Sequence, residues 1–184
     1  MDDLTRIALE AARGSTPARE ALVEASYADV WRLCAALVDR SEADDLAQET
    51  FVRVLRSISR FRGESSARTW LLTIARCTCM DDLRGRHRRR RREAARTALG
   101  LDREREAVDA SETATVRDLF TRLEPERRAA FVLTQQFGLS YEETAAVCGC
   151  AVGTIRSRVA RARADLIALL DDMNELPNAR RQRN

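Results

Sequence analysis

The sequence predicts an all-α protein of two small helical domains joined by a flexible charged linker, the second domain containing a helix-turn-helix. Alanine, arginine, leucine and glutamate dominate its 184 residues, and only three prolines and seven glycines interrupt them. Apolar residues make up 45% of the chain and recur every three or four positions, the period of a helix with one buried face. A charged fraction of 33% adds an ionic surface to that core.

The first half of the chain contains four predicted helices. An apolar stripe over residues 4–11 predicts the first, and Thr16 is expected to cap the second, with Pro17 in its first turn. This second helix should end near residues 39–40. A third helix is expected from about residue 42 to residue 58 because its apolar residues share one face.

The fourth helix leads into a strongly basic segment. Ser65 or Ser66 can cap its start, and it is expected to run into residues 84–92, which hold seven arginines and no acidic residue. Residues 93–112 hold six acidic residues against three arginines and show little periodicity, so they are interpreted as an acidic linker. The N-terminal domain is therefore predicted to span residues 1–92.

The second predicted domain spans residues 113–176 and is followed by a basic tail at 177–184. Two helices are expected within it on either side of Pro125. Ser140, with Glu143 three residues later, forms a capping box at the start of another helix.

A helix-turn-helix follows from the spacing of small and apolar residues. Ala145 and Gly149 lie four residues apart, and Ile155 follows Gly149 by six. The second helix is expected to bury one stripe, formed by Ile155, Val159, Ala162, Leu166 and Leu169. Its basic face carries Thr154, Arg156, Ser157, Arg158, Arg161 and Arg163. Such a helix suits the major groove of DNA, the alternative being a solvated basic helix.

Several classes of protein are disfavoured by the composition. No apolar run spans a bilayer and the acidic start lacks the apolar core of a secretory signal, so a cytoplasmic protein without membrane contact of its own is expected. No nucleophile–base arrangement is found, so neither an enzyme nor a cofactor is expected. Free thiols are favoured, with a metal or redox role left open, for Cys77, Cys79, Cys148 and Cys150.

Two separate groups of residues resemble one known family. Residues 123–131 (LEPERRAAF), 138–143 (GLSYEE) and 149–163 (GCAVGTIRSRVARAR) resemble the fourth conserved region of bacterial sigma factors of the extracytoplasmic-function (ECF) class of the sigma-70 family. Residues 43–51 (ADDLAQETF) and 61–71 (FRGESSARTWL) resemble the second conserved region of the same class. The resemblance implies a helical subunit that binds RNA polymerase core, recognises the −35 and −10 promoter elements and promotes transcription initiation.

The resemblance also implies how this chain binds polymerase. The surface that docks on the beta-prime clamp helices corresponds here to Asp45, Leu46, Gln48 and Glu49. Carboxylates and an amide on a rigid helix can pair with basic helices of a partner, the alternative being an ordinary solvated helix face. The beta flap of the polymerase and an anti-sigma factor are further partners that the resemblance implies.

Promoter contacts follow from the same resemblance. A loop that captures a flipped base of the melted −10 strand corresponds to Phe61, Arg62, Gly63, Glu64, Ser65 and Ser66. For Phe61 the alternative is an ordinary core residue. Three arginines are expected to hold the adjacent duplex through phosphates: Arg76, Arg84 and Arg88. The basic face of the helix-turn-helix would recognise the −35 element. An alternative function, a free-standing helix-turn-helix DNA-binding regulator, leaves residues 43–51 and 61–71 without a role.

Overall fold

The computed structural model describes residues 1–98 and 116–181, and these residues form α-helices and turns without any strand. The all-α prediction is therefore confirmed for the described part of the chain. Single 3₁₀ turns lie at Arg40–Glu42 and Ile58–Arg60. The helices are α1 (Asp3–Ala12), α2 (Thr16–Leu37), α3 (Ala43–Ser57), α4 (Ala67–Ala98), α5 (Val116–Arg122), α6 (Pro125–Gln135), α7 (Tyr141–Cys148) and α8 (Val152–Arg181). Among them, none has both the length and the apolar character that crossing a bilayer requires.

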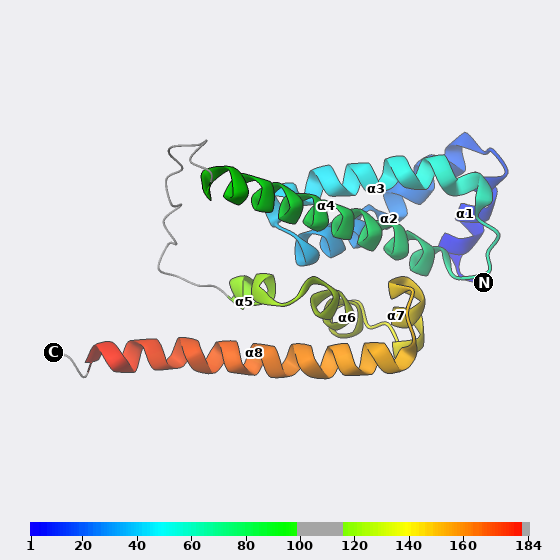
Figure 1. Cartoon of the computed structure of the whole chain (residues 1–184). Helices are drawn as coiled ribbons and strands as arrows, with labels where there is room; N and C mark the ends of the chain where they lie inside the picture. Colours follow the sequence, from blue (N-terminus) through cyan, green and yellow to red (C-terminus); the bar gives the residue numbers. More distant parts are fainter. Residues whose placement is uncertain (99–115, 182–184) are drawn as a thin grey trace.

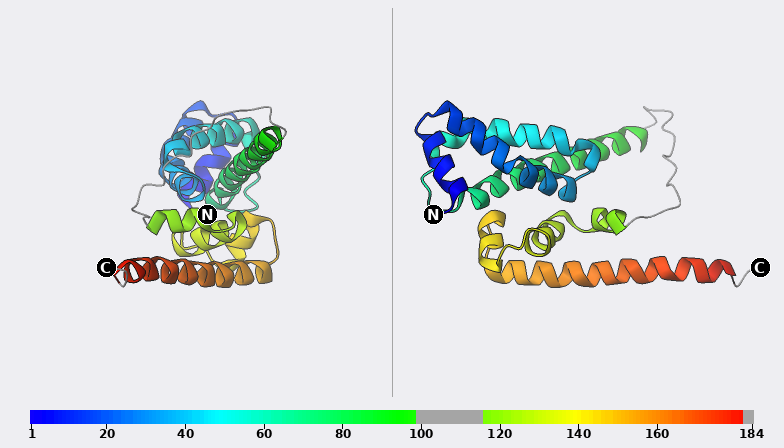
Figure 2. Two further views of the ribbon diagram at one scale, coloured as in Figure 1. Left: turned by 60° about the vertical axis from the view of Figure 1, so that its left-hand side comes forward. Right: turned by 180° about the vertical axis from the view of Figure 1, so that it is seen from behind.

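The helices form two layers, with α1–α4 in the first and α5–α8 in the second (Figures 1 and 2). In the first layer α2 packs against α1, α3 and α4, and in the second α8 packs against α5, α6 and α7. The layers meet where α2 contacts α6 and where α4 contacts α7. Buried side chains of both layers, Leu33 and Ile155 among them, form one apolar cluster. Each such aliphatic side chain stabilises the fold by about 1.5–3 kcal/mol.

Serine side chains begin two of the first-layer helices. Thr16 was expected to cap α2, but it is the first helical residue, and the Ser15 hydroxyl accepts the hydrogen bond from the Ala18 amide at 3.3 Å. At the start of α4 the hydroxyl of Ser66 accepts from the Thr69 amide at 3.1 Å. Of the two serines that could cap α4, Ser66 is therefore the one that does.

The helix-turn-helix is formed by α7 and α8 as predicted. The Glu143 amide donates to the Ser140 hydroxyl at 3.0 Å, and the Ser140 amide donates to the Glu143 carboxylate at 2.8 Å, which completes the capping box. Gly149 ends α7 with a φ of 62°, a left-handed conformation that glycine adopts without steric cost. The turn between the helices therefore requires the glycine that its spacing indicated.

Helix α4 is longer than the sequence predicted. It runs without interruption through the basic segment to Ala98, so residues 93–98, which were assigned to the linker, are helical. Arginine has a high helix propensity, which allows the segment to continue the helix. The rest of the predicted linker, 99–112, lies outside the described residues.

Helix α8 also extends beyond the prediction, because it reaches Arg181 inside the segment 177–184 that was expected to be a tail. Its apolar stripe is buried only at Ile155, Val159 and Ala162. Leu166 and Leu169, expected to continue that stripe, are half-buried because α8 projects past the helices that cover its first half (Figure 1).

Candidate interfaces for polymerase and DNA

The exposed face of α3 holds three of the four residues expected to contact polymerase. Asp45, Gln48 and Glu49 are exposed. Leu46 is only 9% exposed and belongs to the apolar core, so its assignment to the docking surface is corrected. One residue along a helix is a rotation of about 100°, which turns Leu46 away from the face that Asp45 occupies.

Side-chain contacts hold the α3 face to the neighbouring helices. Arg53 donates to Glu49 at 2.9 Å and to Asp81 of α4 at 2.9 Å. At the start of α3, Asp44 accepts a hydrogen bond of 2.8 Å from the indole N–H of Trp31 in α2. The carboxylates of this face therefore lie on a helix that is fixed at both ends.

An apolar groove continues the α3 face, and sequence reasoning missed it. Val52 and Leu55 are 40% and 42% exposed, and Tyr27 of α2 is 37% exposed. A groove of about 750 Å³ lies between α2 and α3 and is lined in part by Val23, Tyr27 and Leu55. Val52 and Leu55 follow Gln48 by four and seven positions, so helical periodicity could have placed them on its face. The contribution of α2 required the fold.

The predicted base-capturing loop lies between the turn Ile58–Arg60 and α4. Arg62, Gly63, Glu64 and Ser65 are exposed there, which fits a role in binding a ligand. Phe61, which was placed in the same site, is only 6% exposed and packs on Trp70 with ring centroids 5.0 Å apart. Its position is therefore corrected from the surface of the loop to its supporting core.

Arg76 differs most from its expected position. It was predicted to contact DNA, but it is 8% exposed and forms an ion pair with Glu126 of α6, whose carboxylate lies 3.2 Å from Arg158 of α8. Burial alone lowers the pKa of Arg76, but neighbouring negative groups that include Glu126 outweigh it and leave the pKa raised. In this arrangement Arg76 faces the second layer rather than solvent.

The other two arginines of the predicted −10 contact are accessible. Arg84 and Arg88 are exposed on the half of α4 that carries the basic segment. Arg84 lies 3.5 Å from Asp81, a surface pair that a phosphate can displace. Between them on the helix, Arg86 pairs with Asp82 at 2.6 Å and with Glu42, so it has acidic partners within the chain.

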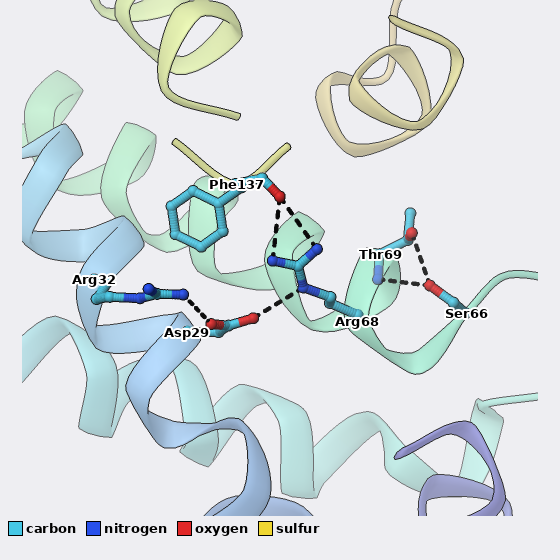
Figure 3. Close-up of polar contacts among 6 residues, drawn as sticks. All are labelled: Asp29, Arg32, Ser66, Arg68, Thr69 and Phe137. Carbon is cyan, nitrogen blue, oxygen red and sulfur yellow. Dashed lines mark hydrogen bonds and ion pairs between the residues drawn. The ribbon is translucent and has the colours of Figure 1, made fainter. Parts of the chain in front are cut away.

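A polar cluster joins the first layer to the turn between α6 and α7 (Figure 3). Asp29 of α2 accepts hydrogen bonds from Arg32 at 2.5 Å and from Arg68 of α4 at 2.9 Å. Arg68 also donates twice to the Phe137 carbonyl at 3.3 Å, and both guanidinium groups lie within 6 Å of the Phe137 ring. Burial opposes ionisation of Asp29, but the two arginines outweigh it and hold its pKa below the usual value.

The start of α8 presents most of its predicted basic face. Arg156, Ser157, Arg161 and Arg163 are exposed. Thr154 is half-buried, and so is Arg158, which pairs with Glu126 at 3.2 Å and lies 3.6 Å from the Cys150 sulfur. Arg163 also bonds the Gln135 side chain at 3.2 Å. Four of the six side chains are thus available to a groove of DNA without a change in the fold.

The cysteines occupy different environments. Cys77 is exposed, Cys79 and Cys148 are buried and Cys150 is half-buried. Burial raises the pKa of Cys148 to about 11, which keeps its thiol neutral at pH 7. Among residues 1–98 and 116–181, no three His, Cys, Asp or Glu side chains gather in a geometry that could hold a metal ion.

Comparisons with known proteins assign this arrangement to a family. The model of Sigma-70 region 2 matches residues 22–92, and that of Sigma-70, region 4 matches residues 114–166. The ECF RNA polymerase sigma factor SigC of Mycobacterium tuberculosis is 49% identical over 166 residues, which are 90% of each chain. The chain belongs to the ECF class of the sigma-70 family. EcfG of Rhodopseudomonas palustris, another ECF sigma factor, is 41% identical over 70% of this chain and 71% of its own.

Solved structures agree with that assignment. CnrH in complex with the cytosolic domain of CnrY is 30% identical, with a TM-score of 0.69 over 92% of this chain and 99% of the other. RpoE of Bartonella quintana, in complex with the anti-sigma factor NepR, is 29% identical, with a TM-score of 0.62 over 83% and 96%. This ECF sigma factor therefore acts in transcription initiation, a role that a free-standing regulator does not share. The sigma-70 family consists of initiation factors rather than enzymes.

Proposed function

We propose that this sigma factor docks on core polymerase through α3, captures the −10 strand at residues 62–66 and recognises the −35 element through the start of α8. One observation carries the proposal: an exposed acidic face on α3, an exposed loop at residues 62–65 and an exposed basic face on α8 occur as separate surfaces of one chain, the first two within the Sigma-70 region 2 match and the third within the region 4 match. The chain contributes binding groups to the polymerase complex and no catalytic step of its own, and it acts in the cytoplasm, where polymerase and promoters are.

The docking surface is chemically suited to the basic clamp helices of the beta-prime subunit. Asp45 and Glu49 supply carboxylates, Gln48 supplies an amide, and Val52 with Leu55 adds apolar area beside them. An apolar centre beside charged groups is the usual composition of a protein interface, with the charges setting orientation and the apolar contacts supplying affinity.

The two promoter contacts differ in what they recognise. Exposed Glu64 and Ser65 can hydrogen-bond the edge of an unstacked base, which gives sequence discrimination in the melted strand. Arg156 and Arg161 at the start of α8 can reach guanine edges or phosphates in the −35 groove. The beta flap is the proposed polymerase contact of this second region.

An anti-sigma factor is the proposed inhibitor. In the two similar structures, RpoE is in complex with the anti-sigma factor NepR, and CnrH is in complex with the cytosolic domain of CnrY. The exposed groove at Val23, Tyr27 and Leu55 offers apolar surface that an inhibitor could cover in competition with polymerase.

Charge reversal on α3 tests the docking assignment. Asp45→Arg is expected to weaken binding of the full chain to core polymerase at least tenfold, because it places a positive charge against basic helices. Asp3→Arg on α1 makes the same charge change at an exposed carboxylate, and its affinity should stay within twofold of the parent. Binding is measured by fluorescence anisotropy of labelled sigma factor. Equal affinities for Asp45→Arg and the parent would show that α3 is not the docking helix.

A further inference from the structure

We infer that α1, which lies outside the matched region 22–92, positions the base-capturing loop, and that the Thr5 hydroxyl is the positioning group. The inference rests on the proposed role of residues 62–66 in binding the −10 strand. Figure 1 places α1 beside the segment that joins α3 to α4.

A chain of three hydrogen bonds connects the start of the protein to the end of the loop. The Asp2 carboxylate accepts from the Thr5 amide at 2.9 Å and from the Thr5 hydroxyl at 2.7 Å. The same hydroxyl oxygen accepts from the Ala67 amide at 2.9 Å, across 62 residues of sequence. Because Asp2 takes the hydroxyl proton, a lone pair of the Thr5 oxygen is left for Ala67. Thr5 is 5% exposed, so water does not replace this bond.

The Ala67 amide needs an acceptor from outside its own helix. It is the first helical residue of α4, and the first amides of a helix have no partner within it. Ser66 accepts from the Thr69 amide and leaves the Ala67 amide to Thr5. The junction between the loop and α4 is therefore fixed partly by α1.

The middle and the other end of the loop are also held in place. Gly63 has a φ of +73°, and a Cβ on it would lie 3.4 Å from the nearest side-chain carbon of Leu9, so the loop passes directly over α1. Phe61 is fixed in the core against Trp70. Between these fixed points the exposed residues Arg62, Glu64 and Ser65 follow a backbone whose course α1 determines.

A preorganised loop binds a single strand without ordering itself first. Losing the Thr5 bond should therefore weaken capture of the −10 strand and leave docking on polymerase unchanged, because α3 and the loop are separate surfaces. A role of Thr5 in stability alone would not weaken strand binding selectively.

The test uses holoenzyme reconstituted from the full chain and core polymerase. The probe is a labelled single-stranded oligonucleotide carrying the non-template −10 segment of a promoter that the holoenzyme transcribes in vitro. Thr5→Val, which keeps the shape and removes the hydroxyl, should weaken oligonucleotide binding about fivefold to tenfold. Thr5→Ser should restore it to within twofold, and core affinity should stay within twofold for both.

Thr78→Val is the matched control. Thr78 is also a buried threonine, 2% exposed, whose hydroxyl donates to the Ile74 carbonyl in α4, eleven residues beyond Ala67. Its oligonucleotide affinity should stay within twofold of the parent although it loses a comparable hydrogen bond. Weakening by Thr78→Val as large as that by Thr5→Val would overturn the inference.

Two results separate failure of the inference from failure of the proposed function. Parent-like oligonucleotide binding by Thr5→Val overturns the inference. Parent-like binding by the double variant Glu64→Ala, Ser65→Ala instead removes the strand-binding role of the loop. If Thr5→Val unfolds at the assay temperature, Leu9→Ala takes its place in the test. This variant keeps the Thr5 bond but removes the side chain that lies beside Gly63, so it must weaken strand binding. Parent-like strand binding by Leu9→Ala would then overturn the inference.

Discussion

At the scale of single residues, Arg128 is a buried charged group that joins the two layers. It is 4% exposed and donates to the carbonyls of Leu37 at 2.6 Å and of Leu123 at 3.1 Å, and also to that of Thr121. Leu37 ends α2 and the other two carbonyls lie at the end of α5, and carbonyls at the C-terminal end of a helix carry partial negative charge. One guanidinium thus caps the C-terminal ends of two helices, a role that the sequence did not indicate.

Arg128→Met should destabilise the protein by about 3 kcal/mol, because three carbonyls lose a charged donor. Arg128→Lys should recover about half of that loss, since an ammonium can satisfy fewer of them. Urea unfolding followed by circular dichroism measures both values. A loss below about 0.5 kcal/mol for the methionine variant contradicts the capping role.

Asp29 makes the cluster at Phe137 sensitive to acid. Its pKa in the folded protein lies below the ordinary value of 3.8, so the unfolded chain takes up the proton first as pH falls. The stabilisation of the folded state by the ionised Asp29 carboxylate is complete above about pH 5. It is lost as pH decreases through the pKa of Asp29 in the folded protein. The difference in Tm between the parent and Asp29→Asn should therefore be smaller at pH 3 than at pH 7. A difference independent of pH would show that the carboxylate charge contributes nothing.

At the scale of helices, the sequence predicted more than it did at the scale of contacts. Apolar periodicity, Pro125 and the capping box placed the helices of the described part, and Gly149 marked the turn before α8, because these signals are local. The burial of Arg76 was not predictable, since its partner Glu126 lies 50 residues away and on another helix. Phe61 and Leu46 were misplaced for the same reason: the core that covers them is assembled from several helices.

The glycine of the turn can be tested against a glycine within a helix. Gly149→Ala should destabilise the protein by about 1 kcal/mol, because alanine is strained at a φ of 62°. Gly153→Ala lies in α8, where an added Cβ meets no atom within 4 Å, and should stabilise by about 0.5–1 kcal/mol. Thermal unfolding compares the two. Equal effects of the same sign would contradict a special backbone requirement at Gly149.

At the scale of the whole molecule, the packing of the two layers covers a predicted DNA contact. Arg76 pairs with Glu126, and Glu126 also pairs with Arg158, so one carboxylate holds an arginine from each layer. A contact of Arg76 with DNA would require α4 and α6 to separate. The proposed polymerase-docking face of α3 does not depend on that separation, since its carboxylates are exposed already.

Glu126→Gln should favour separation of the layers. Removing the charge between two arginines should destabilise the closed arrangement, in which the two layers pack together, by about 2 kcal/mol. The ratio of closed to open protein should then fall roughly thirtyfold. Small-angle X-ray scattering should detect a larger radius of gyration, and Glu142→Gln, an exposed carboxylate on α7, should not change it. An unchanged radius for Glu126→Gln would indicate that the remaining contacts between the layers hold them together without this ion pair.

The continuity of α4 through the basic segment limits how that segment attracts a nucleic acid. On a rigid rod with 1.5 Å rise per residue, residues 84–92 cover about 12 Å of axis and point in every direction around it. About half of the seven arginines can therefore neutralise one strand at the same moment, and Arg86 is already satisfied internally. A plot of the logarithm of the segment's affinity for DNA against the logarithm of ionic strength should then have a slope of about −3. A flexible peptide of the same composition could have a slope of about −6.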